Sequence, residues 1–206
     1  CCGYEISVPA TKTFTNQVIT FLIMAYRLAG RDIHELDILP DLMEQTIHMT
    51  NPVVQALTPS VNLWNDLYCL GYGATYPMAL EGALKLKEIT YAHCEGMLST
   101  EFKHGPLSAV TKDFPILFAA GPQDVSLIVS GINEVTCRGG RAIVIGQEDA
   151  RLRAHASDMI TIPQASPEIS ALLSVLPLQL LAYHMSVARG YDPDFPRNLS
   201  KTLTVD

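Results

Sequence analysis

Apolar residues recur at helical spacing through the first third of the chain. One such segment covers residues 10–30, and a second begins at Asp32, which is a suitable helix cap. Pro52 and Pro59 interrupt the second segment, because proline lacks the backbone N–H that a helix needs and crowds the preceding turn. The pattern therefore predicts two helices followed by a connector over residues 50–62, with no complete sheet in this part of the chain.

From residue 63 onward, short apolar runs alternate with helical segments. The runs are predicted to be strands, and they cover residues 66–71, 114–120, 141–146 and 158–162. Helical patterns cover residues 77–94, a segment that ends near Arg138, and residues 167–189. Strands that are apolar along their whole length and alternate with helices are typical of a parallel sheet covered on both faces. We expect an α/β fold, a three-layer αβα sandwich, in which ligands bind beyond the carboxyl ends of the strands.

The composition supports a globular domain and argues against some classes of function. The 206 residues are 48% hydrophobic and 17% charged, which is enough to bury a sizeable core. The formal net charge of -7 and the lack of any basic run argue against binding to nucleic acid or to acidic membranes. No stretch approaches the roughly 20 apolar residues that cross a membrane, and no basic-then-apolar leader opens the chain. We expect a cytoplasmic protein.

The cysteines do not have the spacing of metal ligands. They are Cys1, Cys2, Cys69, Cys94 and Cys137. Buried free thiols in a reducing compartment are the favoured interpretation for Cys69 and Cys94. We expect neither a metal nor a cofactor. The chain begins without Met and enters an apolar pattern at once, which predicts that it is part of a longer protein.

A charged ladder on the helix predicted over residues 77–94 is the first candidate for chemistry. Glu81, Lys85 and Glu88 are spaced so that all three lie on one face of the helix. Such a ladder is most often an exposed row of salt bridges. This helix, however, starts at the carboxyl end of a strand, where ligands bind, and a carboxylate in a dry pocket can carry a proton between adjacent carbons of a sugar. Both interpretations stay open on the ladder alone.

His104 is the second candidate. It precedes Gly105 and Pro106, a pair that favours a loop. A loop histidine at the edge of a sheet is suited to acid–base chemistry, because histidine ordinarily titrates near neutrality. A surface or capping histidine is an equally good interpretation of the same residues.

The C-terminal segment, residues 192–206, has no helical period. A disordered end is the default for a terminus. Four apolar side chains make this segment too hydrophobic for a solvated tail, and they are Phe195, Leu199, Leu203 and Val205. An arm that packs across a site fits better, and Lys201 on such an arm would reach a substrate carbonyl and form an imine as the free amine.

Three segments together carry a resemblance to a known family. They are residues 79–88 (ALEGALKLKE), 103–107 (KHGPL) and 197–201 (RNLSK). In this order they resemble the second sugar-isomerase (SIS) domain of the glucosamine-6-phosphate synthase family. Residues 175–184 are similar to the helix that precedes the C-terminal arm of that family, and residues 5–12 are similar to a segment near the end of its first SIS domain.

The resemblance implies a division of the chain. Residues 1–62 would be the helical remnant of a preceding SIS domain plus the connector, residues 63–190 the second SIS domain, and residues 191–206 an arm that closes the sugar site. The rest of the first SIS domain and a glutaminase domain would lie elsewhere in the longer protein. The active form would be a homodimer or a higher oligomer.

The resemblance also implies an activity. The family converts fructose 6-phosphate to glucosamine 6-phosphate with ammonia from glutamine. Glu88 would move a proton between sugar carbons 1 and 2, and Lys85 would assist it and stabilise developing oxyanion charge. His104, supplied by the partner subunit, would open the sugar ring. Lys201 would form the imine with the open-chain ketose.

Further positions match the family or depart from it. Val8 and Ser200 match positions that contact the sugar through backbone groups. Residues 7–10 (SVPA) are closer to deaminase and deglycase relatives. The turn at residues 119–124 (AAGPQD) has no hydroxyl groups to bind a phosphate. We therefore expect this part of the enzyme alone to be inactive and to bind the sugar phosphate weakly.

Two other functions remain open. A two-domain SIS sugar-phosphate deaminase or deglycase would use the same glutamate and histidine in the releasing direction. A non-catalytic sugar-phosphate-binding regulatory module is the third interpretation. Glu88, His104 and Lys201 together argue against a regulatory module, because a sensor has no need of an imine-forming lysine.

Overall fold

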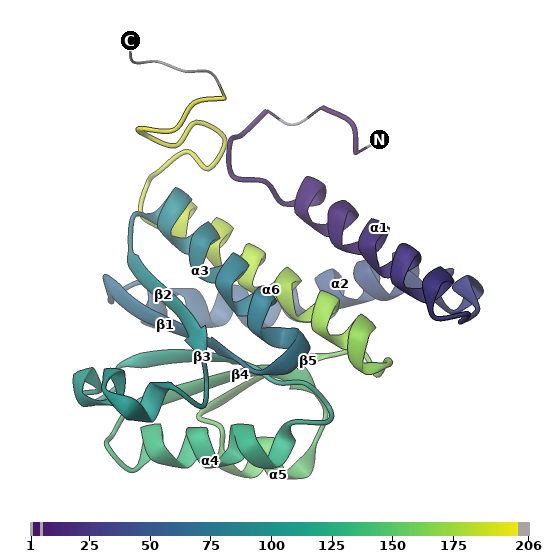
Figure 1. Ribbon diagram of the computed structural model, residues 1–206. Coiled ribbons are helices and arrows are strands. Elements are labelled where there is room, and N and C mark those ends of the chain that lie inside the picture. Colours follow the sequence, from purple (N-terminus) through teal and green to yellow (C-terminus); the bar gives the residue numbers. More distant parts are fainter. Residues whose placement is uncertain (1, 5, 202–206) are drawn as a thin grey trace.

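A parallel sheet of five strands lies at the centre of the computed structural model, which describes residues 2–4 and 6–201 (Figure 1). The strands are β1 (Asp66–Gly71), β2 (His93–Leu98), β3 (Pro115–Ala119), β4 (Arg141–Gln147) and β5 (Asp158–Ile162). Their order is β2-β1-β3-β4-β5, and every neighbouring pair is parallel. The chain therefore adds strands on both sides of β1, as in other doubly wound sheets.

Helices cover both faces of this sheet, as Figure 1 shows. On one face lie α2 (Leu39–Val61), α3 (Tyr76–Thr90) and α6 (Pro167–Ala188), and on the other lie α4 (Val125–Thr136) and α5 (Ala150–His155). Successive strand residues point to opposite faces. In β4, Ile143 and Ile145 join the core beneath α2, α3 and α6, whereas Ala142 and Val144 join the core beneath α4. The predicted three-layer αβα sandwich is confirmed.

The described residues before β1 are helical. α1 (Lys12–Leu28) precedes α2, and no strand is present in residues 2–4 and 6–62. α1 lies outside the three layers (Figure 1), but its half-buried apolar side chains pack against the core that α2, α3 and α6 share. Short 3-10 turns occur at Ile33–Leu36, Gly73–Thr75, Phe102–His104 and Pro106–Ala109. The division of the chain at residue 62 stays a prediction.

The prediction of a connector over residues 50–62 is wrong, because α2 continues through both prolines to Val61. The face of this helix that includes Val54, Leu57 and Val61 is buried in the main core. Burial of each such side chain contributes about 1.5–3 kcal/mol. Three of them offset a cost of about 3 kcal/mol for each proline inside a helix. Tertiary packing therefore keeps a helix that the local pattern interrupts.

The helix predicted over residues 77–94 ends early, and a strand that the pattern did not predict follows it. α3 stops at Thr90, Tyr91 takes a left-handed conformation with a φ of 59°, and β2 begins at His93. β2 is an edge strand in which Cys94 is the one fully buried residue. It therefore lacks the apolar run that marks the other strands.

Cys69 and Cys94 are buried free thiols, as predicted. Their sulfur atoms lie 3.5 Å apart on the neighbouring strands β1 and β2. The hydrogen bond with Cys94 and the burial of the site raise the pKa of Cys69 well above its ordinary value, so its thiolate is disfavoured. Both residues pack as small apolar groups.

α6 is apolar all round because it is the central helix of its layer. In the described part of the chain it is the one helix long and apolar enough to cross a membrane by length and composition, with a mean hydropathy of 1.5 in its most apolar stretch. The expectation that no stretch approaches this length is therefore wrong. The burial of 67% of that stretch inside the protein accounts for its composition.

Arg189 holds together the ends of three helices at the point where the C-terminal arm begins. Its guanidinium donates to the carbonyl oxygen of Thr90 at 2.8 Å, to Asn62 Oδ1 at 2.6 Å and to the carbonyl oxygen of Trp64 at 2.7 Å. Burial lowers the pKa of Arg189. The three acceptor oxygens offset the cost of burying the guanidinium charge. The guanidinium in turn supplies hydrogen-bond donors to carbonyl oxygens that have no partner within their own helix.

α3 and α6 are in close contact at Gly82. A methyl group added there would lie 2.4 Å from Leu178 Cδ1 and 2.8 Å from Leu178 Cβ. No larger residue fits unless Leu178 moves. This contact sets the distance between the two helices, and with it the position of every side chain on α3.

Gly82→Ala is expected to lower the free energy of unfolding by about 1–3 kcal/mol, because the added methyl overpacks the contact with Leu178. Alanine is the better helix former, so propensity alone predicts the opposite sign. Urea denaturation measures the change. Leu178→Ala alone opens a cavity and costs about 2–5 kcal/mol. The double variant should be more stable than the two single effects predict, and strict additivity would contradict the contact.

Candidate active site

The charged ladder of α3 is buried. Lys85 Nζ lies 2.6 Å from Glu88 Oε2 and 3.2 Å from Glu81 Oε1. The side chains of Lys85, Glu88 and Glu81 are 4%, 17% and 10% exposed, respectively. A lysine ammonium enters an interior only when carboxylates pair with it, because an unpaired buried charge is very costly. The interpretation as an exposed row of salt bridges is therefore wrong.

This cluster contains two carboxylates and one ammonium group. Burial raises the pKa of Glu81, the neighbouring Lys85 opposes the rise, and the charge of Glu88 adds to it. When all three groups are ionised, the cluster carries one negative charge in excess. Burial and a nearby second carboxylate both disfavour the charged form of a carboxylate, so such a group is suited to accept a proton.

The cluster lies toward the amino end of the sheet, whereas the position of the helix led us to expect the carboxyl end. α3 does begin beyond the carboxyl end of β1, but it runs back across the sheet and carries Glu88 about 18 Å from that edge at 1.5 Å per residue. The backbone N–H of His93 donates to the carbonyl oxygen of Asn65 at 2.6 Å, so α3 ends beside the starts of β1 and β2.

Two hollows flank the cluster, and the C-terminal arm borders both. The first has a volume of about 190 Å³ and is lined by Ser7, Pro9, Thr11, Lys85, Ile89, Gln179, Tyr183, Pro193 and Asp194. The second has a volume of about 330 Å³ and is lined by Lys87, Glu88, Tyr91, Arg197, Asn198 and Leu199. The ion pair between Lys85 and Glu88 thus lies between two spaces that a small molecule can enter.

The N-terminal segment and the arm meet beside Lys85. Ser7 Oγ donates to the carbonyl oxygen of Pro193 at 2.8 Å. Val8 is half-buried between Ser7 and Pro9, which both line the first hollow. The structure therefore brings Val8 close to the cluster.

The arm passes over the end of α3 (Figure 1), and Ser200 and Lys201 are the next residues of the arm after those that line the second hollow. Both residues are exposed, and they follow Leu199, which lines the same hollow as Glu88. Two of the predicted apolar anchors are largely exposed, Phe195 at 73% and Leu199 at 39%, so these two do not hold the arm. The other two predicted anchors, Leu203 and Val205, lie outside the described residues.

His104 lies apart from the cluster. It is exposed, and it belongs to the 3-10 turn that follows β2 at the carboxyl end of the sheet. β2 spans about 16 Å at 3.3 Å per residue, and α3 ends at the opposite end of this strand. The structure does not bring His104 and Glu88 together within one chain.

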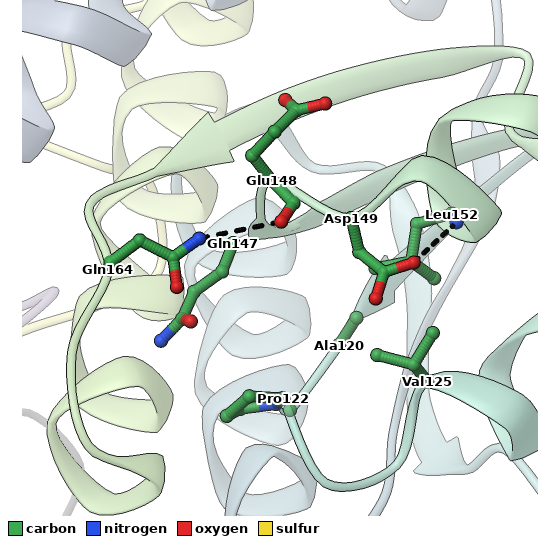
Figure 2. A pocket seen from close by; sticks show the side chains of 9 residues that line it. Ala120, Pro122, Val125, Gln147, Glu148, Asp149, Leu152 and Gln164 are labelled. Atoms are coloured by element: carbon green, nitrogen blue, oxygen red, sulfur yellow. Dashed lines mark hydrogen bonds between the residues drawn. The ribbon is translucent and has the colours of Figure 1, made fainter.

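A separate pocket lies beyond the carboxyl ends of β3, β4 and β5 (Figure 2). Its volume is about 180 Å³, and its polar lining residues are Gln147, Glu148, Asp149 and Gln164. Figure 2 shows Gln164 Nε2 donating to the carbonyl oxygen of Glu148, at 3.4 Å. The Arg151 guanidinium lowers the pKa of Asp149 to about 2, so this carboxylate stays ionised. Among residues 2–4 and 6–201, no lysine, arginine, serine or threonine lines the pocket.

The turn before α4 is also unfavourable for an anion. Asp124 immediately precedes Val125, the first residue of α4, at the position where helix N-termini bind phosphate. Its Oδ2 fills the space beside Gly121, where an added methyl group would lie 2.8 Å away. Burial raises the pKa of Asp124. A carboxyl group therefore occupies the place that a phosphate would take.

Comparison with known proteins assigns this arrangement to a family. The profile of the SIS domain matches residues 62–189, which is more than half of the chain. The chain belongs to the SIS domain family. It is 43% identical, over 99% of its length, to glutamine–fructose-6-phosphate aminotransferase [isomerizing] of Pyrobaculum aerophilum, and 41% identical, over 99% of its length, to the enzyme of that name from Legionella pneumophila. It spans 35% of the length of each of these relatives.

Solved structures agree with this assignment. The C-terminal domain of glucosamine-fructose-6-phosphate aminotransferase from Francisella tularensis has a TM-score of 0.84 and 30% identity, over 92% of this SIS chain and 57% of that chain. Glucosamine-6-phosphate deaminase from Thermotoga maritima has a TM-score of 0.79 and 22% identity, over 94% and 57% of the two chains. The second likeness shows the fold alone. The resemblance found in the sequence motifs is confirmed.

Some walls of the site in this SIS domain have no clear sequence signal. Gln179 and Tyr183 line the hollow beside Lys85, and within the described part of the chain Gln179 Nε2 is buried without a hydrogen-bond partner. In the sequence, these two residues are marked only by lying four positions apart, and so on one face, in an otherwise apolar helix. No sequence pattern marks Tyr91, because its place in the wall of the second hollow depends on the left-handed backbone conformation that ends α3.

Glu81→Gln is expected to change how stability depends on pH. Because burial raises the pKa of Glu81 above its ordinary 4.5, the folded protein holds this proton more tightly than the unfolded chain. The resulting stabilisation is present below the ordinary pKa and is lost as the pH rises through the raised one. The variant should therefore gain stability relative to wild type as the pH rises above 4.5 and through the raised pKa.

Urea unfolding across that range measures the difference. Glu101→Gln, which changes an exposed carboxylate, is the matched control and should show a nearly constant difference. A pH-independent difference for Glu81→Gln would show that burial does not control this group.

Proposed function

We propose that this chain is the sugar-isomerising portion of a longer synthase that converts fructose 6-phosphate and glutamine-derived ammonia to glucosamine 6-phosphate. The observation that carries the proposal is a buried Glu81–Lys85–Glu88 cluster beside the arm that carries Lys201. The identity of 43% over nearly the whole chain to an aminotransferase of this activity supports it.

Glu88 is the proposed base that moves the proton between sugar carbons 1 and 2. Its carboxylate lines the hollow beneath the arm and keeps 17% exposure, so it can contact a bound sugar while most of its surroundings are protein. The Lys85 ammonium, 2.6 Å away, holds this carboxylate in place. The same positive charge would stabilise the oxyanion that develops on the sugar during proton transfer.

Lys201 is the proposed nucleophile. As the neutral amine it attacks the ketone carbon, and loss of water gives an imine that makes the neighbouring C–H bond more acidic. Removal of water from around a lysine favours the neutral amine. The arm borders the Glu88 hollow through Arg197 and Leu199, so closure of the arm on a bound sugar would bring the imine toward Glu88.

Val8 and Ser200 are proposed to contact the sugar through backbone groups. Val8 lies in the segment that borders Lys85, and Ser200 lies next to Lys201 on the arm. A bound sugar between them would have the N-terminal segment on one side and the arm on the other. The hydrogen bond between Ser7 and Pro193 supports this arrangement, because it joins the two segments.

His104 is proposed to open the sugar ring in the site of a partner subunit. It is exposed at the end of β2 that is remote from Glu88. An acid–base group must contact the ring oxygen in the site where Glu88 acts, and the fold prevents this within one chain. The proposed active form is therefore a homodimer or a higher oligomer.

The phosphate group of the substrate is proposed to bind outside this chain. The pocket of Figure 2 and the turn at Asp124 present carboxylates where a phosphate needs converging donors. A preceding SIS domain, within the part of the relatives' length that this chain does not cover, would hold the phosphate. A glutaminase domain would supply the ammonia. We expect the whole enzyme to act in the cytoplasm.

The 206-residue chain by itself is expected to bind fructose 6-phosphate with a dissociation constant of about 1 mM or weaker. The physical reason is that a dianionic phosphate finds no cluster of donors on the described residues of this domain. Isothermal titration calorimetry makes the measurement, with the full-length protein as the comparison. Micromolar binding by the chain alone would contradict a phosphate site elsewhere.

In the full-length protein, Lys201→Arg is expected to abolish the trapping of labelled fructose 6-phosphate by borohydride, because a guanidinium does not form an imine. Glu88→Gln should still trap the sugar, but it should slow hydrogen exchange at the sugar carbon by about 100-fold or more. Mass spectrometry of the reduced adduct and solvent-deuterium incorporation measure the two steps separately.

Lys87→Arg is the matched control, since Lys87 lines the same hollow and its ammonium is exposed. This variant should trap sugar at the wild-type rate. Normal trapping by Lys201→Arg would show that the imine assignment is wrong, and loss of trapping in Lys87→Arg would reassign the imine to Lys87.

A further inference from the structure

The side chain of Tyr91 contacts the C-terminal arm at three points. Its hydroxyl oxygen accepts a hydrogen bond from the backbone N–H of Arg197 at 2.9 Å. The Arg197 guanidinium carbon lies 4.0 Å from the centre of the tyrosine ring, within the range of cation–π attraction. The ring centre also lies 4.7 Å from that of Tyr191, at an interplanar angle of 53°. One side chain therefore contacts both the start of the arm and the segment just before Lys201.

The backbone of Tyr91 makes a tyrosine unusual at this position. The residue adopts φ 59° and ψ 16°, the left-handed conformation that ends α3. Glycine, or sometimes asparagine, normally occupies such a helix end, because a larger side chain crowds the backbone there. A tyrosine that is kept in a strained conformation points to a role for its side chain.

The contacts of Tyr91 also set the shape of the hollow beside Glu88. Glu88 and Tyr91 line one wall of this hollow, and Arg197, Asn198 and Leu199 line the other. Arg189 donates to the carbonyl oxygen of Thr90, so the end of α3 that bears Tyr91 is itself held in place. The distance between Glu88 and the arm therefore depends on the ring and hydroxyl of Tyr91.

From this geometry we infer that Tyr91 is a positioning residue, which holds the arm so that Lys201 reaches a sugar bound at Glu88. The inference rests on the proposed function and adds to it a residue that acts through the arm. Phe195 and Leu199, two apolar side chains of the described arm, are 73% and 39% exposed and contribute little to this hold. The ring of Tyr91, at the end of the helix that carries the proposed base, thus adds to the hold that the Ser7 hydrogen bond gives the arm at Pro193.

Tyr91→Gly in the full-length protein removes the contacts of the side chain and leaves the helix end intact. Glycine favours the left-handed conformation, so α3 still ends normally, whereas all three contacts with the arm are lost. We expect borohydride trapping at Lys201 to slow by about 10- to 100-fold at saturating sugar. We also expect trypsin to cut after Arg197 faster than in wild type, because the arm is released. Tyr91→Phe, which removes only the hydrogen bond, should show smaller changes in both.

Asp113→Gly is the matched control. Asp113 also has a left-handed backbone, with a φ of 63°, and it lies in the turn before β3, where its backbone N–H donates to the carbonyl oxygen of Gly139. This variant should change neither trapping nor cleavage after Arg197. Equal cleavage rates in Tyr91→Gly and wild type would overturn the inference, and so would faster cleavage without slower trapping. If the wild-type protein does not trap the sugar, the imine proposal fails. The cleavage assay still tests Tyr91 in that case, because equal cleavage rates in Tyr91→Gly and wild type would refute its role in holding the arm.

Discussion

The close contact between α3 and α6 at Gly82 is the constraint on which the candidate site depends. Because no side chain at this position separates the helices, α3 lies directly against Leu178, and Lys85 lies in the wall of a hollow that Gln179 of α6 also lines. An ammonium in such a position needs the two carboxylates that surround it, since its charge would otherwise be buried without compensation. The packing of two helices thus produces a buried cluster with one carboxylate more than it needs for neutrality. The proposed proton transfer uses one of these carboxylates.

The candidate site does not lie where ligands usually bind in a parallel sheet. In most open parallel sheets, ligands bind beyond the carboxyl ends of the strands. In this SIS domain that edge carries Glu148 and Asp149 (Figure 2), and Asp124 at the start of α4. The groups proposed for the sugar chemistry lie instead at the far end of α3, where the arm begins (Figure 1). Arg189 joins α3 to the start of the arm. Its guanidinium donates to the end of α3, and it is itself the first residue after α6. The helix that covers the sheet, rather than the sheet edge, therefore positions the groups of the proposed chemistry.

The sequence by itself determined the α/β architecture, because β1, β3, β4 and β5 are continuous apolar runs and each is followed by a segment with helical or turn character. Such patterns are local, and burial on both faces of a strand leaves a direct trace in composition. It also determined that Glu81, Lys85 and Glu88 share one face, because the period of the helix alone places them there. The motifs around Lys85, His104 and Lys201 carried the family resemblance in the same way.

Only the tertiary structure decided which of these local features are buried and what they face. α2 passes through Pro52 and Pro59 because its apolar face packs on a distant core, and β2 forms because its backbone pairs with β1 although its side chains are largely exposed. The ladder is buried because α6, the N-terminal segment and the arm cover it, and Tyr91 meets Arg197 across more than a hundred residues of sequence. These outcomes depend on contacts between remote segments, and no pattern within a single segment contains them.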